Sequence, residues 1–188
     1  KALIKDLYIE DARLTKQKNR YITALKKFIE LYGDQDVEIY SAPGRSEICG
    51  MHTDHQHGKM LACAVNRDMI AVVAKTDDNV IDITSEGFDE IRNITLNKSG
   101  LKLAFDEQGT TEALIKGIVS KFKDLHYEVG GFKAYITSEV PLYSGMSSSA
   151  AIEVLLGTVL NGLYNNGSIS PLIIAQIAQY AENIYFGK

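Results

Sequence analysis

The chain has 188 residues, of which 45% are hydrophobic and 23% are charged, and this composition suits one globular domain with a sizeable core. Its net charge of −4 excludes the basic surface that binds nucleic acid or an anionic membrane, so neither partner is expected. No apolar run approaches the roughly 20 residues that a membrane-spanning helix requires.

The cysteines and the first residues indicate a reducing compartment. Cys49 and Cys63 lie far apart in the sequence and lack C-x-x-C spacing, so we predict reduced, buried and inert thiols. The first residues lack the basic, apolar and small-residue order of a signal peptide, which favours a cytoplasmic protein. Because no repeat or low-complexity linker is present, we expect one compact unit.

The first half of the chain is predicted to form one helix and several short strands. Apolar residues recur at helical spacing over residues 15–32, and Gly33 follows as a C-cap. Later segments are short, rich in Val, Ile and Thr, and separated by turn residues, which is typical of strands and hairpins. The predicted strands are 37–40, 68–75, 80–84 and 91–96.

The second half returns to helical spacing. An amphipathic segment precedes the turn Gly130-Gly131 and an alternating run, and a nearly all-apolar segment follows. Ser170 then caps a last helix, and Pro171 suits its first position. The predicted elements are a helix at 111–124, a strand at 132–140, a helix at 148–164 and a helix from 171 towards Glu182 and Tyr185.

Residues 41–59, "SAPGRSEICGMHTDHQHGK", gather two acids, one Arg, three His and three Gly. Carboxylates and imidazoles that lie close together can supply several directional hydrogen bonds. A zinc site from His52, His55, His57 and either cysteine is disfavoured, because the spacing matches no familiar structural zinc pattern. For His57 alone, a polar loop position is the simpler interpretation.

The segment "PLYSGMSSSAAIEV" ends a predicted strand, turns at a glycine and opens a helix with three serines. The free N–H groups and the positive dipole end of such a helix favour an anion, although Ser147 or Ser148 could simply cap the helix. No Lys stands in this loop, so a Walker-type nucleotide site is disfavoured. A hydroxyl in the first turn can bind Mg²⁺ if a carboxylate such as Glu182 joins it.

Two segments in register resemble the galactokinase family of the GHMP small-molecule kinases. "APGRSEICGMHTDHQHGKML" is similar to the galactokinase signature, in which a Gly-Arg pair leads to Gly-Glu-His-Thr-Asp, and "VPLYSGMSSSAAIEV" resembles the phosphate loop of the same enzymes. The resemblance implies an α+β fold, the GHMP kinase amino-terminal domain (ribosomal protein S5 domain 2-like), with a mixed sheet backed by helices. It also implies ATP-dependent phosphorylation of the anomeric (1-position) hydroxyl of galactose.

The same resemblance implies a role for each matching residue. Arg45 is the implied catalytic residue that stabilises the charge of the transferring phosphoryl group. ATP and Mg²⁺ are the implied cofactors, with Ser149 and Glu182 as metal ligands. The implied sugar-binding segment is Met51, His52, Thr53 and Asp54, and the implied phosphate loop is Tyr143, Ser144, Gly145, Met146, Ser147, Ser148 and Ser149.

Departures from the family pattern concern the sugar. Galactokinases place a Glu where this chain has Met51, an Asn where it has Glu47, and a first loop Gly where it has Tyr143. Losing the carboxylate at Met51 removes repulsion against a sugar that is anionic at carbon 6, such as galacturonate, which His55 or His57 could then pair. Alternatively, Glu47 restores the acid and galactose remains the substrate, which is the alternative placed first.

The resemblance also implies that residues 1–188 are a GHMP kinase amino-terminal domain that ends before the catalytic Asp loop and before the carboxy-terminal domain of the same chain. We therefore expect the parent protein to be the kinase and this fragment to have negligible turnover alone. A rival from another class is a galactokinase-like sugar sensor that binds without transferring phosphate. Because Ser148, Ser149 and Ala150 retain the phosphate-loop pattern, the enzyme is favoured.

Overall fold

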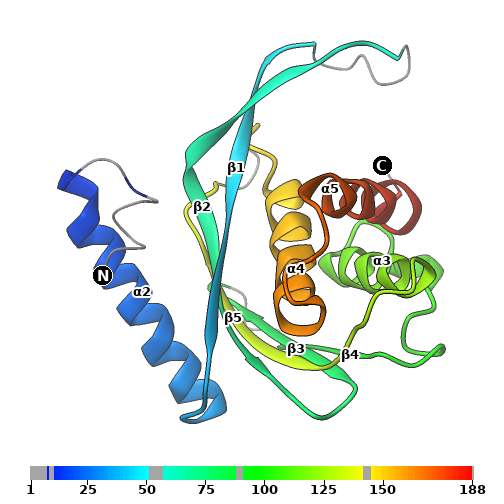
Figure 1. Ribbon diagram of the computed structural model, residues 1–188, viewed down its shortest axis with the longest axis horizontal. Helices are drawn as coiled ribbons and strands as arrows, with labels where there is room; N and C mark the ends of the chain where they lie inside the picture. The colour runs from blue at the N-terminus through cyan, green and yellow to red at the C-terminus, as the bar shows by residue number, and fades with distance from the viewer. Residues whose placement is uncertain (1–7, 9–10, 51–56, 88–90, 142–144, 188) are drawn as a thin grey trace.

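The computed structural model describes residues 8, 11–50, 57–87, 91–141 and 145–187 (Figure 1). Its centre is one sheet of five strands in the order β1-β2-β5-β3-β4. The β3–β5 pair is parallel and the other neighbours are antiparallel, so the sheet is mixed. The strands are β1 (Glu38–Cys49), β2 (Leu61–Lys75), β3 (Val80–Ser85), β4 (Ile91–Thr95) and β5 (Phe132–Ser138).

Strands β1 and β2 are longer than predicted and form a ribbon that projects beyond the rest of the sheet (Figure 1). The prediction stopped β1 at residue 40 and began β2 at residue 68, because the intervening residues carry no alternating apolar pattern. In the structure Ser46 pairs with Cys63, and Glu47 pairs with Ala62. Ladder hydrogen bonds join backbone groups whatever the side chains are, so a polar ribbon forms without the sequence signal of a buried strand.

Both cysteines lie on this ribbon and both are exposed. The prediction of buried thiols is therefore wrong, although both cysteines are free as expected. The prediction placed these small apolar residues in a core. The ribbon on which they lie extends past the helices that cover the sheet (Figure 1).

Helix α2 (Asp11–Tyr32) covers one face of the sheet. Its apolar stripe of Tyr21, Ala24 and Phe28 packs against Ile70, Val72 and Ala74 of β2. The intervening residues of β2 point to the opposite face and are buried as well, which explains why residues 69–74 read as a continuous apolar run. The predicted helix at 15–32 is confirmed, with one more turn at its start.

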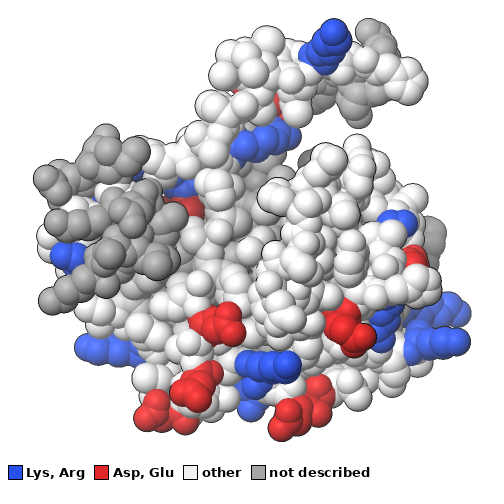
Figure 2. Space-filling model, in the orientation of Figure 1, with Lys and Arg blue, Asp and Glu red and all other residues white. Residues whose placement is uncertain are grey.

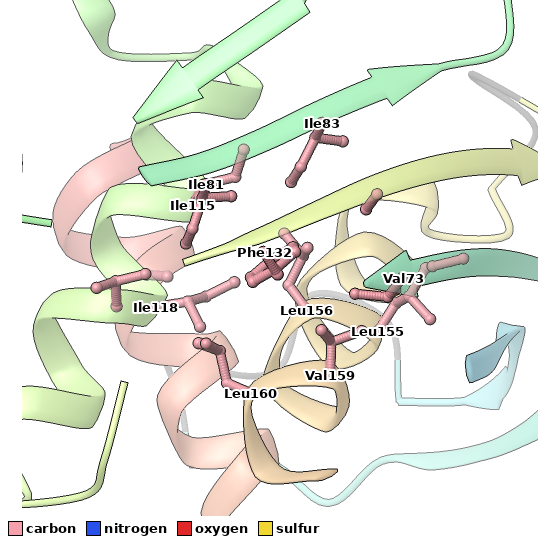
Figure 3. Packing of buried hydrophobic residues seen from close by; sticks show 14 of the residues in the cluster. Val73, Ile81, Ile83, Ile115, Ile118, Phe132, Leu155, Leu156, Val159 and Leu160 are labelled. Carbon is pink, nitrogen blue, oxygen red and sulfur yellow. The ribbon is translucent and has the colours of Figure 1, made fainter. Parts of the chain in front are cut away.

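The opposite face of the sheet carries three α-helices, and the prediction of an α+β fold with a mixed sheet backed by helices is confirmed. Figure 3 shows Ile81 and Phe132 of the sheet packed between side chains of two of these helices, among them Ile118 and Leu156. The helices are α3 (Thr111–Asp124), α4 (Ser148–Asn165) and α5 (Pro171–Tyr180), and a short 3-10 helix, η2 (Phe105–Glu107), precedes α3.

The last helix does not continue as an α-helix to Tyr185. After α5 the chain widens into a π-helix, η3 (Ala181–Phe186), in which Gly187 N–H donates to the carbonyl of Glu182, five residues back, at 3.1 Å. The wide turn shifts the inward positions by one residue, so Ala181 is buried but Ile184 is 55% exposed. Hydrophobic spacing alone could not predict a one-residue insertion of this kind.

A buried ion pair fixes α2 to the sheet. Arg20 Nη1 lies 2.5 Å from Asp68 Oδ1, and its Nη2 donates to the carbonyls of Asp68 at 2.9 Å and Thr137 at 3.0 Å. Ser41 Oγ donates to the second Asp68 oxygen at 2.6 Å. The two ionic side chains are 10% and 8% exposed, so the buried Asp68 carboxylate depends on Arg20 for charge compensation.

The surface agrees with the composition. On the face in Figure 2, lysines and arginines are interspersed with acidic residues, and the surface over α4 and α5 is almost free of charge. Residues 154–181 contain no Asp, Glu, Lys or Arg, which accounts for that uncharged area. Among the residues that the structure describes, no helix combines the length and the apolarity that crossing a membrane requires.

Candidate functional site

The site is built around the amino terminus of α4, where the preceding loop has an unusual backbone. Gly145 and Ser147 have φ angles of 76° and 50°, in the left-handed region. Ser147 occupies the N-cap position, but its side chain makes no capping hydrogen bond. Capping by the Ser147 side chain is thus contradicted, and the left-handed turns leave the first N–H groups of α4 for another acceptor.

Ser149 in the first turn of α4 meets Glu182 at the start of η3. Ser149 Oγ donates to Glu182 Oε1 at 3.1 Å, and both residues are partly buried. The structure therefore brings together the two predicted metal ligands, which are 33 residues apart in the sequence. Their separation suits Mg²⁺, because two neighbouring oxygens of an octahedron with metal–oxygen distances of about 2.1 Å lie about 3 Å apart.

Strand β1 lies directly against the predicted phosphate loop. Arg45 N–H donates to the carbonyl of Met146 at 3.2 Å. Gly44 permits this approach, since a Cβ atom there would lie 3.2 Å from the same carbonyl and 3.1 Å from the Val140 side chain. The predicted catalytic Arg45 is therefore next to the loop that opens α4.

The Arg45 side chain forms an ion pair with Glu47. Arg45 Nη1 contacts Glu47 Oε1, and the two side chains are 35% and 21% exposed. The sequence analysis considered Glu47 only as a substitute acid for the sugar and missed this pair. The spacing of two residues on a strand was the available signal, because such residues share a face.

Helix α3 holds η3, and with it Glu182, in place. A Cβ atom on Gly117 would lie 2.9 Å from the Cα of Ala181 and 2.9 Å from the Tyr185 ring, so only glycine permits this contact. The rings of Tyr180 and Tyr185 are 6.1 Å apart, and both residues are partly buried. The close approach is what sets the position of Glu182.

We predict that Gly117→Ala destabilises the protein that carries this chain by about 1–2 kcal/mol. The added methyl group must displace the backbone of η3, and this cost exceeds the gain of about 1 kcal/mol in helix propensity. The measurement is the free energy of unfolding in urea. Gly157→Ala is the matched control, since its methyl meets only the movable Ile174 side chain at 2.9 Å; an equal or smaller loss for Gly117→Ala would contradict the prediction.

Other predicted site residues lie outside the described part of the chain. These are Met51, His52, Thr53, Asp54, Tyr143 and Ser144, and also His55. Within the described residues, no group of three or more His, Cys, Asp or Glu side chains could hold a metal ion. The geometry thus covers the phosphate and metal side of the predicted site, together with Arg45.

Family models of known proteins match two parts of the chain. Residues 26–75 match the galactokinase galactose-binding signature, and residues 113–188 match the GHMP kinases N terminal domain. The galactokinase of Clostridium tetani is 30% identical over 170 residues, which cover 90% of this chain and 42% of the relative. That of Streptomyces coelicolor is 32% identical over 165 residues, with 88% and 42% covered. The chain thus spans about two fifths of the length of these relatives.

Solved structures show the same relationship. The galactokinase of Lactococcus lactis, solved in complex with galactose, superposes with a TM-score of 0.80 at 29% identity, over 89% of this chain and 43% of that one. The mevalonate kinase of Methanococcus jannaschii superposes with a TM-score of 0.65 at 19% identity, over 79% of this chain and 46% of that one. At that identity the second likeness concerns the fold alone.

Proposed function

Because this chain belongs to the galactokinase family of the GHMP kinases, we propose that the protein that carries it transfers the γ-phosphate of ATP to the anomeric hydroxyl of galactose. The observation that carries the proposal is the contact of Ser149 with Glu182 beside the α4 amino terminus. An anion-binding helix end, two hard oxygen ligands and an arginine are the parts that phosphoryl transfer needs, since it relies on positioning and charge neutralisation.

Each residue has a defined task in this proposal. The N–H groups at the start of α4 and the loop from Gly145 to Ser149 hold the phosphates of ATP. Ser149 and Glu182 hold Mg²⁺, which when bound offsets the phosphate charge. Arg45 stabilises the charge that develops on the transferring phosphoryl group. His52, Thr53 and Asp54 bind the sugar hydroxyls.

We further propose that residues 1–188 form the amino-terminal domain of the kinase and that the general base lies outside them. Asp54 is engaged with sugar hydroxyls and is therefore not free to accept the proton of the attacking hydroxyl. The isolated chain is accordingly expected to show no turnover under conditions in which the whole protein is active.

The sugar is the open part of the proposal, and Met51 is the reason. A thioether cannot accept the hydrogen bond that the usual Glu offers to the exocyclic hydroxyl of galactose. Galacturonate is the second candidate, because its carboxylate would not be repelled at this position. We place galactose first, since the remaining His-Thr-Asp pattern of the signature is unchanged.

The test is ATP consumption by the whole protein with galactose, galacturonate, N-acetylgalactosamine, glucose and homoserine, each with and without Mg²⁺. We expect magnesium-dependent turnover with galactose. Turnover with galacturonate alone would transfer the proposal to that sugar, and Met51→Glu should then reverse the preference. Magnesium-dependent nucleotide binding without turnover of any sugar would overturn the kinase and favour a sugar sensor.

A further inference from the structure

Among the described residues, those directly opposite the ion pair of Arg45 and Glu47 are uncharged. Both side chains leave the same face of β1, because residues two apart on a strand share a face. The residues directly opposite on β2 are Ala64 for Arg45 and Ala62 for Glu47. Neither alanine has a polar side-chain group that could bind Arg45 or Glu47, and the two ionic groups pair with each other.

Arg45 is held at its backbone by Met146 and at its tip by Glu47. Its N–H is bound to Met146, which places the residue beside the phosphate loop. The side chain beyond has several rotatable bonds, and ordering it costs conformational entropy. A side chain that must meet a phosphoryl group in one geometry gains from a partner that restricts it beforehand.

We propose that Glu47 is a positioning residue for Arg45, an inference that rests on the proposed kinase function. The carboxylate engages one Nη of the guanidinium, which has five N–H donors, and leaves the others for an incoming anion. Glu47 thereby orients Arg45 towards the transferring phosphoryl group before ATP arrives.

The arrangement has an electrostatic consequence. A carboxylate paired with Arg45, whose N–H binds the loop before α4, repels the ATP phosphates proposed to bind there and offsets part of the attraction of Arg45 in the ground state. Glu47 therefore weakens the binding of ATP while it improves the geometry of the transition state. Removing Glu47 should therefore lower both kcat and KM for ATP, a combination that the loss of a merely structural residue would not produce.

Glu47→Ala in the whole protein tests the inference. We expect kcat to fall about 10-fold and KM for ATP to fall several-fold, with KM for the sugar unchanged. Glu47→Asp should restore part of kcat, because it keeps the charge on a shorter side chain. Ser46→Ala is the matched control, since Ser46 is the exposed residue between the two and faces the other side of the strand.

A double-mutant cycle makes the assignment specific. On an Arg45→Lys background, where the guanidinium fork is missing, Glu47→Ala should have little further effect on kcat. A Glu47→Ala protein that only raises KM for the sugar would overturn the inference and assign Glu47 to sugar recognition. Unchanged kcat and KM for ATP would overturn it as well.

Calorimetric binding of MgATP separates this inference from the proposed function. Glu47→Ala is expected to bind MgATP several-fold more tightly than the unmodified protein, whether or not any sugar is turned over. An unmodified protein that turns over no sugar would overturn the kinase proposal, while equal MgATP affinities for the two proteins would overturn the role of Glu47.

Discussion

Replacing Glu182 with Gln is expected to lower the magnesium-dependent turnover of the whole protein on the order of 100-fold and to raise the Mg²⁺ concentration that gives half-maximal rate. The amide keeps an oxygen that can accept the Ser149 hydrogen bond, so the fold around the contact is retained. The negative charge is lost, and Ser149 contributes only a neutral oxygen. The measurement is a magnesium titration of the initial rate.

The control for this substitution is Asn183→Ala, because Asn183 is the next residue of η3 and is exposed. We expect the control to keep both the rate and its magnesium dependence. A Glu182→Gln protein with the same magnesium midpoint as the unmodified protein would contradict the assignment of Glu182 as a metal ligand. A lower rate with an unchanged midpoint would place Glu182 in another role.

Arg20→Ala is expected to reduce the free energy of unfolding by about 3–5 kcal/mol. The substitution leaves the Asp68 carboxylate, which is 8% exposed, without its positive partner. It also removes the donor to the carbonyls of Asp68 and Thr137. Breaking one side of a buried pair costs more than the pair contributes as a whole, because the remaining charge stays buried.

Urea denaturation of the whole protein measures the loss in the free energy of unfolding. Hydrogen exchange at the amides of β2 and β5 shows where in the fold the stability is lost. The neighbouring Arg67→Ala is the control, since Arg67 is exposed and should change stability by no more than about 0.5 kcal/mol. Adding Asp68→Asn to Arg20→Ala should recover part of the loss. A loss for Arg20→Ala below about 1 kcal/mol would show that the pair is not needed to fix α2.

The elements that sequence patterns predicted are those whose side chains face the core. Helix α2 has an apolar stripe, and residues 69–74 of β2 form an apolar run, because helices cover both faces of the sheet there. The distal part of the β1–β2 ribbon and the π-helix were not predicted, because sequence patterns detect side chains that face the core. Backbone hydrogen bonds define them, and the side chains of the ribbon, including both cysteines, carry no burial signal.

The candidate site was predictable to the extent that a motif names residues. The resemblance to galactokinases named Ser149 and Glu182, and the structure brings them within a hydrogen bond. The pairing of Arg45 with Glu47 was not predicted, because the family pattern has an Asn at the second position and supplies no reason to expect an ion pair. The contact of Gly117 with Ala181 was also missed, since a glycine in a helix is usually read as a weak point.

The ribbon of β1 and β2 divides the two substrates of the proposed reaction between parts of different rigidity. Residues 69–73 of β2 pair with β1 on one side and β5 on the other, whereas residues 61–64 pair with β1 alone. Strand ends with one partner and exposed side chains open locally at a lower free energy than a buried core. The phosphate loop, by contrast, leads into a helix packed in that core. The donor nucleotide of the proposed reaction would therefore meet a more rigid part of the molecule than the acceptor sugar.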